Sequence, residues 1–251
     1  MMFSPLKISV ITAVYNRVSS IEQAIKSVQA QNWPNIEHIV VDGGSTDGTL
    51  QILQSYIREQ TVLISEPDEG LYDALNKGFA RATGDVIGVM HSDDFFANDS
   101  VLTRVATSFT DPDLGAAYGD LDYVGKSDTS RIIRRWRPGN YNPAKLARGW
   151  MPPHPTLYLR RSVIERWGGF DTRYKVAADY DAILRYFGQG KILATYIPHV
   201  MVKMRIGGAS NRSVSKIWLK TCEDYAALRS NGVGGMGSLI MKNVGKLGQF
   251  I

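Results

Sequence analysis

One short stretch, Gly84–Asp94, constrains the fold of this chain more than any other. Val86–Met90 is an apolar run with β-branched residues, typical of a strand buried on both faces in a mostly parallel sheet. The run leads to adjacent acids, Asp93 and Asp94, and open α/β sheets bind ligands outside the carboxyl ends of their strands. Taken alone, such a pair is more often a solvated turn. At a sheet edge, paired carboxylates are hard oxygen ligands suited to a Mg²⁺ or Mn²⁺ ion that also binds substrate phosphates.

The first part of the chain alternates between expected strands and expected helices. Apolar residues at helical spacing separate the strands, for example Leu71, Leu75 and Phe79, and this alternation predicts right-handed βαβ units around a parallel sheet. Acids follow the successive strands, so the sequence predicts several carboxylates at one edge of the sheet. The expected strands are 7–14, 36–41, 62–65 and 86–90, and the acids that follow them are Asp42, Glu66, Asp68, Asp93 and Asp94.

The pattern becomes mixed after Asp94. Residues 1–98 are expected to form a Rossmann-like nucleotide-binding half of an α/β fold, residues 99–212 an acceptor-binding half, and residues 213–251 a C-terminal helical extension. Helices are expected at 101–109, 161–167, 176–187 and 213–229, and strands at 114–123, 132–136 and 192–205, the last broken into two at Pro198.

Composition and charge exclude several classes of protein. The formal net charge of +5 suits phosphorylated small molecules or an anionic membrane surface, but it is too diffuse to indicate nucleic-acid binding. Cys222 is the only cysteine, so an intrachain disulfide and a cysteine-rich metal site are excluded. No apolar run approaches the ~20 residues that a membrane-spanning helix needs, and the start does not resemble a signal peptide. These features predict a cytoplasmic enzyme.

The first expected strand is not followed by the phosphate-binding loop of a dinucleotide enzyme, because no G-x-G-x-x-G stands there. The G-x-x-x-x-G-K-[ST] pattern of a P-loop NTPase is absent from the sequence as well. Carboxylates alone would repel a diphosphate. A bridging divalent cation removes that repulsion, so a Mn²⁺ or Mg²⁺ cofactor is expected.

Several short segments, each weak alone, are highly specific in their order and spacing. They are Ser9–Asn16, Val41–Thr49, Asp73–Gly78, Ser92–Asp94, Gly168–Asp171 and Ala178–Asp181. Through them the chain resembles the family 2 inverting glycosyltransferases of GT-A fold, which pass a sugar from a nucleotide-sugar to an acceptor hydroxyl. The resemblance is strong over residues 7–95 and thinner toward residue 205. Many members have Glu-Asp where this chain has Ala178-Asp179, so the second acid is in place and the first is not.

The resemblance implies roles for residues near the sheet edge. Asp42 would accept a hydrogen bond from the ring N–H of the base, with an Asx turn as its plain structural alternative. Thr12 and Asn16 would line the nucleoside, and ordinary strand-end and turn chemistry explains them nearly as well. Asp93 would contact the ribose or the metal, and Asp94 would bind the metal directly.

Further residues are candidates for donor or acceptor contacts. Gly70 would let the backbone approach the sugar or ribose closely, and Asp73 would either contact the donor or simply favour the positive end of a helix. Lys77 would neutralise donor charge. Arg205 begins a glycine-hinged loop that is either a lid over the diphosphate or a plain connector. His154, in a proline-rich segment, is either an acceptor-binding residue or surface filler.

Asp179 and Asp181 lie two residues apart on an expected helix, so they cannot share one face of it. One would face the cleft and the other would cap or pair elsewhere. The resemblance assigns Asp179 as the general base that takes the acceptor proton.

The tail after Gly232 carries apolar residues at near-helical spacing with lysines between them. Such a stripe would lie in the interface of an anionic membrane and bring the enzyme to a lipid-linked acceptor. The alternative is a helix packed on its own domain or on a second subunit. The stripe consists of Met236, Ile240, Val244, Leu247 and Ile251, with Lys242 and Lys246 between them.

The resemblance implies a metal-dependent inverting glycosyltransferase of cell-surface glycan assembly, with a UDP-sugar donor, a glycan or lipid-linked acceptor and a location in the cytoplasm or at the inner face of the plasma membrane. A hypothesis of another class is a non-catalytic nucleotide-sugar-binding relative that serves as a partner subunit. Intact Asp93, Asp94 and Asp179 argue against it. A sugar nucleotidyltransferase would have a Gly-rich, basic loop after the first strand, which this chain lacks.

Overall fold

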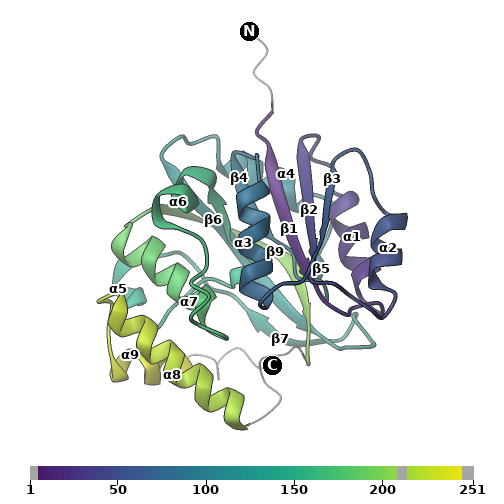
Figure 1. The fold of residues 1–251 in the computed structure, drawn as a ribbon. Coiled ribbons are helices and arrows are strands. Elements are labelled where there is room, and N and C mark those ends of the chain that lie inside the picture. Colours follow the sequence, from purple (N-terminus) through teal and green to yellow (C-terminus); the bar gives the residue numbers. More distant parts are fainter. Residues whose placement is uncertain (1–4, 208–213, 245–251) are drawn as a thin grey trace.

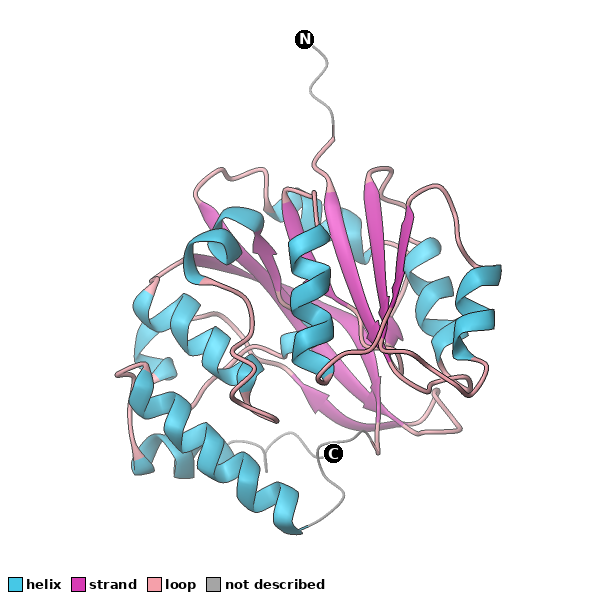
Figure 2. Cartoon of the chain, viewed as in Figure 1, coloured by secondary structure: helices cyan, strands magenta, loops and turns pink. Residues whose placement is uncertain are grey.

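A mixed sheet forms the centre of the molecule in the computed structural model, which describes residues 5–207 and 214–244 (Figures 1 and 2). Its strands are β1 (Ile8–Val14), β2 (Ile36–Asp42), β3 (Thr61–Ser65), β4 (Val86–Val89), β5 (Phe95–Phe96), β6 (Leu114–Val124), β7 (Ile132–Trp136), β8 (Tyr158–Arg160) and β9 (Leu193–Arg205). They follow the order β3-β2-β1-β4-β8-β6-β9-β5, and β7 pairs with β6 outside that path.

The half of the sheet formed by β3, β2, β1 and β4 matches the sequence-based prediction. These four strands are parallel neighbours, and β1 and β4 are buried along their whole length. Because parallel strands end at the same edge, Asp42 at the end of β2 and the acids that follow β4 come to one side of the sheet. The expected alternation of strands and helices is therefore confirmed.

Helices cover both faces of the sheet. They are α1 (Ile21–Gln29), α2 (Thr49–Ser55), α3 (Leu71–Arg81), α4 (Val101–Ser108), α5 (Pro143–Leu146), α6 (Arg161–Trp167), α7 (Ala178–Ile183), α8 (Val214–Ser230) and α9 (Met236–Val244), with a 3₁₀ turn η1 (His154–Thr156) and a π-helical segment η2 (Leu184–Gln189). Buried side chains of α1, α2 and α4 form one core, and those of α3, α6 and α7 form the other. Figure 1 shows α3 in front of the strands and α4 behind them. The helix α3 can lie close to β1 because Gly78 has no side chain. A Cβ at this position would collide with the side chain of Ile11.

The acceptor half differs from the prediction at Pro198. The expected break into two strands is wrong, because β9 runs as one strand and the irregularity appears as a shift in its register with β6 beside Gly119 and Asp120. Proline has no N–H to donate, so a register shift next to it avoids an unpaired position in the ladder. Beyond it β9 regains its pairing with β6 and runs on to Arg205.

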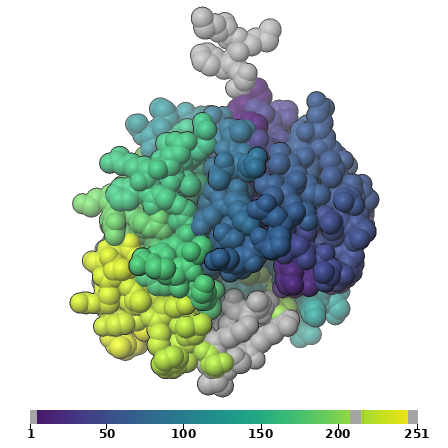
Figure 3. Space-filling view, viewed as in Figure 1, coloured from purple at the N-terminus to yellow at the C-terminus, as the bar shows by residue number. Residues whose placement is uncertain are grey.

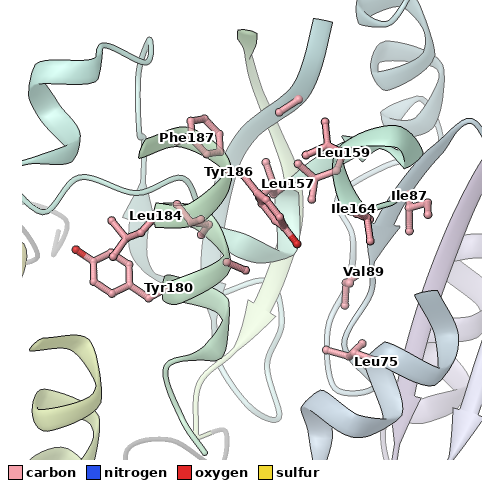
Figure 4. Close-up of a cluster of buried hydrophobic side chains, with 14 of the residues drawn as sticks. Leu75, Ile87, Val89, Leu157, Leu159, Ile164, Tyr180, Leu184, Tyr186 and Phe187 are labelled. Carbon is pink, nitrogen blue, oxygen red and sulfur yellow. The ribbon is translucent and has the colours of Figure 1, made fainter. Parts of the chain in front are cut away.

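The helix expected at 176–187 is shorter than predicted. The helix α7 ends at Ile183, and η2 continues the chain with wider, π-type hydrogen bonding. Figure 4 shows buried side chains of the two segments, Tyr180 of α7 and Tyr186 and Phe187 of η2, which belong to the same core as Leu159 and Leu75. Leu184, Tyr186 and Phe187 of η2 are buried, and apolar periodicity does not distinguish such a segment from an α-helix.

The C-terminal extension packs against α7. The buried residues Ala227 and Leu228 of α8 and Leu239 of α9 belong to the same core as Tyr180, and Figure 3 shows the yellow surface of this extension lying directly against the green surface of the acceptor half. The predicted boundary at residue 212 falls outside the described residues. Within the described ranges, no helix is long and apolar enough to span a bilayer.

Candidate active site

The loops that leave β1 and β2 are cross-linked at the carboxyl edge of the sheet. Asn16, in a left-handed conformation with φ 50°, accepts a hydrogen bond from the N–H of Thr46 through Oδ1 at 2.9 Å, and its own N–H donates to Oγ of Ser45 at 2.9 Å. The N–H of Arg17 donates to Oγ1 of Thr49 at 2.8 Å. These bonds join the two loops, so the turn chemistry that was the structural alternative for Asn16 is present.

Asp42 lies fully buried at the end of β2. Its carboxylate accepts hydrogen bonds from the N–H of Ser45 at 3.2 Å and from Oγ of Ser65 at 2.7 Å. The turn chemistry that was its structural alternative is therefore present, and a carboxylate with several lone pairs can serve a nucleobase as well. Thr12 lies deeper: its side chain is fully buried, with Oγ1 3.0 Å from Nε2 of His38.

The loop before α3 is held by Lys77. Its Nζ lies 3.0 Å from Glu66 and 3.5 Å from Asp73, and it donates to the carbonyl of Pro67 at 2.8 Å. The hydrogen bond to Glu66, more than the other contacts, raises the pKa of Lys77. Gly70 has φ +121°, a conformation that L side chains rarely adopt, and Asp73 accepts the N–H of Glu69 through Oδ2 at 3.1 Å. These residues therefore fix the loop that faces the sheet edge.

The acids after β4 have different environments. Asp94 is fully buried; its Oδ1 accepts the backbone N–H of Arg205 at 3.1 Å, and its Oδ2 has no hydrogen-bond partner among the described residues. Burial first, and then the nearby charge of Asp93, raise the pKa of Asp94 well above its ordinary value. A buried carboxylate oxygen without a partner is costly unless a ligand or a cation completes it.

Arg205 closes this corner from β9. Its guanidinium donates to the carbonyl of Asp93 at 2.5 Å and to Oε1 of Gln23, and it lies 5.1 Å from the centre of the Phe95 ring. The side chain predicted to reach the diphosphate therefore holds the turn that carries the two acids. Most of the loop predicted as a lid beyond it lies outside the described residues.

These groups suit a cation that substrate phosphates and water also bind, rather than a site in which the protein supplies every ligand. In residues 5–207 and 214–244 no group of three or more His, Cys, Asp or Glu side chains is arranged to hold a metal ion. Asp94 provides a free buried oxygen and Asp93 a neighbouring carboxylate. A divalent ion here would need further ligands from phosphate oxygens or water, which is how Mg²⁺ is usually bound.

The acceptor half brings a second carboxylate to the site, at the start of α7. Oδ2 of Asp179 lies 3.1 Å from Nδ1 of His154, and Nε2 of His154 lies 2.9 Å from Nε2 of His91. The hydroxyl of Tyr72 lies 3.3 Å from Oδ1 of Asp179 and donates to the carbonyl of Val176 at 2.8 Å. The structure thus joins the predicted base and the predicted acceptor residue, which are separate in the sequence.

Electrostatics keep this chain of groups in defined protonation states. Burial alone raises the pKa of Asp179, but its contact with His154 outweighs burial and holds the pKa below its ordinary value. Burial, with His154 beside it, lowers the pKa of His91 to about 4. Burial raises the pKa of Tyr72, and Asp179 adds to the effect. At neutral pH Asp179 is therefore ionised, His91 neutral and Tyr72 protonated.

Asp181 pairs elsewhere, as the offset from Asp179 predicted. Its carboxylate lies 2.9 Å from Nη2 of Arg185 and accepts from Nδ2 of Asn231 at 2.8 Å, and its side chain is 8% exposed against 18% for Asp179. Asp181 therefore connects α7 to the end of α8.

Glu223 of α8 holds the start of the base-bearing helix and was missed from the sequence. Its carboxylate accepts three backbone N–H groups, from Lys175 at 2.9 Å, Val176 at 2.8 Å and Ala177 at 2.9 Å. These N–H groups precede the first turn of α7 and have no partner within the helix. Nothing in the sequence signals this contact, because α8 is distant in the chain; Tyr72 and His91 were missed as partners for the same reason.

Neither of two surface hollows coincides with these residues. One, with a volume of about 280 Å³, lies where β2 and β3 begin, at the edge away from the acids, between Trp33 and Arg58. The other, of about 490 Å³, is lined by apolar groups including Tyr141 and Phe187. The acids at the sheet edge therefore lie outside both hollows.

Comparison with known proteins gives a consistent result. A model of the family described as "Glycosyl transferase family 2" matches residues 9–167. An uncharacterized glycosyltransferase of Mycobacterium tuberculosis is 32% identical over 186 residues, 73% of this chain and 70% of that protein. A PGL/p-HBAD biosynthesis glycosyltransferase of Mycobacterium bovis is 30% identical over 218 residues, 84% of this chain and 82% of that protein.

Solved structures share the fold. Staphylococcus aureus TarS 1–349 in complex with UDP-GlcNAc superposes with a TM-score of 0.73 at 20% identity, over 91% of this chain and 66% of that one, whereas the match covers 39% of the longer TarS chain. The mannosyltransferase PcManGT from Pyrobaculum calidifontis, in complex with GDP-Man and Mn²⁺, superposes with a TM-score of 0.62 at 19% identity, over 96% of this chain and 80% of that one. The fold is therefore of the GT-A type, and the chain, an enzyme, belongs to glycosyl transferase family 2.

Proposed function

We propose that this glycosyltransferase moves a sugar from a nucleotide-sugar to an acceptor hydroxyl in one inverting step. The observation that carries the proposal is a pair of carboxylates from the two halves of the fold. Asp94 is fully buried and one of its oxygens has no partner among the described residues, and Asp179 is partly buried and held by His154. The two acids are connected through His91, which lies three residues before Asp94 and whose Nε2 is 2.9 Å from Nε2 of His154, the partner of Asp179. The proposed cation-binding group and the proposed base are therefore linked by direct contacts.

The proposed reaction is a displacement at the anomeric carbon. The acceptor oxygen forms the new bond to that carbon on the face opposite the diphosphate, and the bond to the diphosphate oxygen breaks with its electron pair leaving on the nucleotide. Asp179 takes the proton of the acceptor hydroxyl. When bound, a divalent cation would stabilise the charge that develops on the departing diphosphate. Asp94 and Asp93 are the residues that would hold it.

The donor is proposed to be a UDP-sugar. Asp42, Asn16 and the backbone near Gly70 would bind the nucleoside and ribose, while Thr12, which is fully buried, would support them from below. Lys77 and Asp73 would line the diphosphate side, and Arg205 would keep the acid turn in place below it. TarS was solved with UDP-GlcNAc and PcManGT with GDP-Man and Mn²⁺, which supports a nucleotide-sugar donor and a cation without choosing the base.

The acceptor is proposed to be a glycan or lipid-linked hydroxyl of a cell-surface polysaccharide, met at the cytoplasmic face of the membrane. The stripe in α9 supports a membrane contact, because Met236, Ile240 and Val244 are all more than half exposed. Lys242 does not serve it: this lysine is 6% exposed and lies 2.8 Å from Asp224 and 3.1 Å from the centre of the Tyr180 ring. Leu247, Ile251 and Lys246 lie outside the described residues.

A thermal-shift screen with Mn²⁺ tests the donor proposal. A ligand that binds the native state raises the melting temperature by mass action. We expect UDP-sugars, with UDP-GlcNAc as the first probe, to raise it more than GDP-mannose does. A screen in which no nucleotide-sugar stabilises the protein would contradict the proposal.

Two further measurements test the cation and the membrane contact. Full transfer activity in excess EDTA would show that no divalent ion takes part. Equal sedimentation of the full chain and of a chain truncated after Gly232 with anionic vesicles would remove the membrane contact. The non-catalytic alternative is not favoured, since the similar proteins are named as glycosyltransferases; release of nucleoside diphosphate by the purified protein would exclude it.

A further inference from the structure

Two imidazoles connect the segment that leaves β4 with the start of α7. His91 follows β4 and precedes the acids Asp93 and Asp94, while His154 begins η1 in the acceptor half. Their rings meet edge to face, with centroids 5.1 Å apart and planes at 72°. Since Nε2 of each ring lies 2.9 Å from Nε2 of the other, one of the two nitrogens carries the shared proton.

The contact with Asp179 decides which nitrogen that is. Asp179 is ionised at neutral pH, so Oδ2 can only accept, and Nδ1 of His154 at 3.1 Å must carry a hydrogen. In a neutral His154 the other nitrogen, Nε2, then accepts from Nε2–H of His91. Both nitrogens of His154 are therefore occupied, and neither is free to take a proton from an acceptor.

The two oxygens of Asp179 differ for the same reason. Oδ2 is held by His154, whereas the only contact of Oδ1 among the described residues is Tyr72 at 3.3 Å. A tyrosine has one hydroxyl proton, and that of Tyr72 goes to the carbonyl of Val176 at the shorter distance of 2.8 Å. No other described residue donates to Oδ1, so among the described residues its lone pairs are free.

We propose that His154, itself held by His91, is a positioning residue that binds Oδ2 of Asp179 through Nδ1–H and leaves Oδ1 as the atom that takes the acceptor proton. This inference rests on the proposed function of Asp179 as the base. It replaces the expectation that His154 binds the acceptor. It also joins the base to the segment that carries the cation-binding acids, so a displacement of that segment would move the base.

Two matched variants test the contacts of the two ring nitrogens of His154 separately. The amide nitrogen of an asparagine reaches the place of Nδ1, whereas that of a glutamine reaches the place of Nε2. We expect His154→Asn to keep the hydrogen bond to Asp179 and to remain within about fivefold of the wild-type kcat, and His154→Gln to lose it and to fall by about 10-fold to 10²-fold, as misplaced catalytic groups do. The KM and Kd for the donor should not change in either variant. Equal kcat values for the two variants would overturn the proposal.

The measurement uses the full chain, with Mn²⁺ and the nucleotide-sugar that stabilises it most in the thermal-shift screen, and follows release of nucleoside diphosphate with water as acceptor. Imidazole ¹⁵N spectra at pH 8 provide a readout that needs no turnover: we expect His154 as the Nδ1–H tautomer and His91 as the Nε2–H tautomer. An Nε2–H tautomer of His154 would overturn the inference. If the tautomers are as expected but the wild type releases no nucleotide from any donor it binds, the proposed function fails while the positioning contact stands.

Discussion

The donor half and the acceptor half hold their acids in different ways. In the donor half, Asp42 is bound by Ser45, three residues along the chain, and Asn16 by the loop after the neighbouring strand. In the acceptor half, Asp179 is bound by His154, which in turn contacts His91, and its helix is held by Glu223 of α8. A parallel sheet therefore builds the nucleoside side of the first site from short-range rules, although Asp94 is bound by Arg205 of β9, whereas the second site depends on three separate segments being packed together.

If the two halves hold their acids independently, replacing an acid of one half should change the function of that half only, either donor binding or removal of the acceptor proton. We expect Asp94→Asn to abolish metal-dependent binding of the nucleoside diphosphate, because an amide does not replace a carboxylate as a hard anionic ligand. The fold should be retained or stabilised without metal, since the change removes charge from a fully buried carboxylate. Calorimetric titration of UDP with and without Mn²⁺ measures this. Unchanged Mn²⁺-dependent binding would place the cation elsewhere.

The complementary change is Asp179→Asn. We expect transfer to fall by ~10²-fold to 10⁴-fold, the usual loss for a general base, with donor affinity barely altered. Asp181→Asn is the matched control on the same helix, and it weakens the contact with Arg185. It should lower the stability of the fold at most, and transfer by the folded protein should change little. A folded but inactive Asp181→Asn beside an active Asp179→Asn would reverse the assignment of the two acids.

The dependence of the acceptor half on distant segments is tested by Glu223. Glu223→Ala removes the acceptor of three N–H groups at the start of α7 and should lower the free energy of unfolding by about 1–3 kcal/mol. Transfer should fall by about 10-fold to 10²-fold with donor affinity unchanged, because the base loses its alignment. Glu223→Gln keeps one acceptor oxygen and should restore most of the activity. If Glu223→Ala has wild-type kcat, α8 does not position the base.

The smallest effect on function is expected for Glu37, an acid of the donor half that lies away from the carboxyl edge of the sheet. Glu37 accepts from Ser9 at 2.5 Å, from Thr83 at 2.6 and 2.9 Å and from Lys7 at 3.0 Å. Burial alone raises the pKa of Glu37, but these hydrogen bonds outweigh it and lower the pKa from 4.5 to about 2. A lowered pKa stabilises the fold above pH 4.5, and that stabilisation is lost as the pH falls from 4.5 toward 2.

Glu37→Gln should therefore lower the free energy of unfolding at pH 7 by about 1–2 kcal/mol, allowing for solvent screening, and by less at pH 3. Transfer and donor binding should match the wild type. Urea unfolding at the two pH values measures the difference. An equal loss of stability at both would mean that the charge of Glu37 contributes nothing.

Sequence patterns were most informative where the structure is local. The four parallel strands and the acids after them follow from apolar runs and polar strand ends, because a strand buried on both faces has few alternative readings. The break at Pro198 was wrong because pairing with β6 continues past a register shift, which no local pattern records. The change from α7 to η2 was missed because apolar spacing is nearly the same in both.

The sequence by itself determined the class of fold, the family resemblance and the acids at the sheet edge, since each depends on residues close together in the chain. Only the tertiary structure decided that His154 binds Asp179 rather than standing apart from it, that Lys242 is buried against Asp224, and that Glu223 holds the start of α7. These contacts join segments far apart in the chain. Hydrogen bonds and ion pairs of this kind depend on distance and direction in the packed core, and no periodicity of the sequence encodes either.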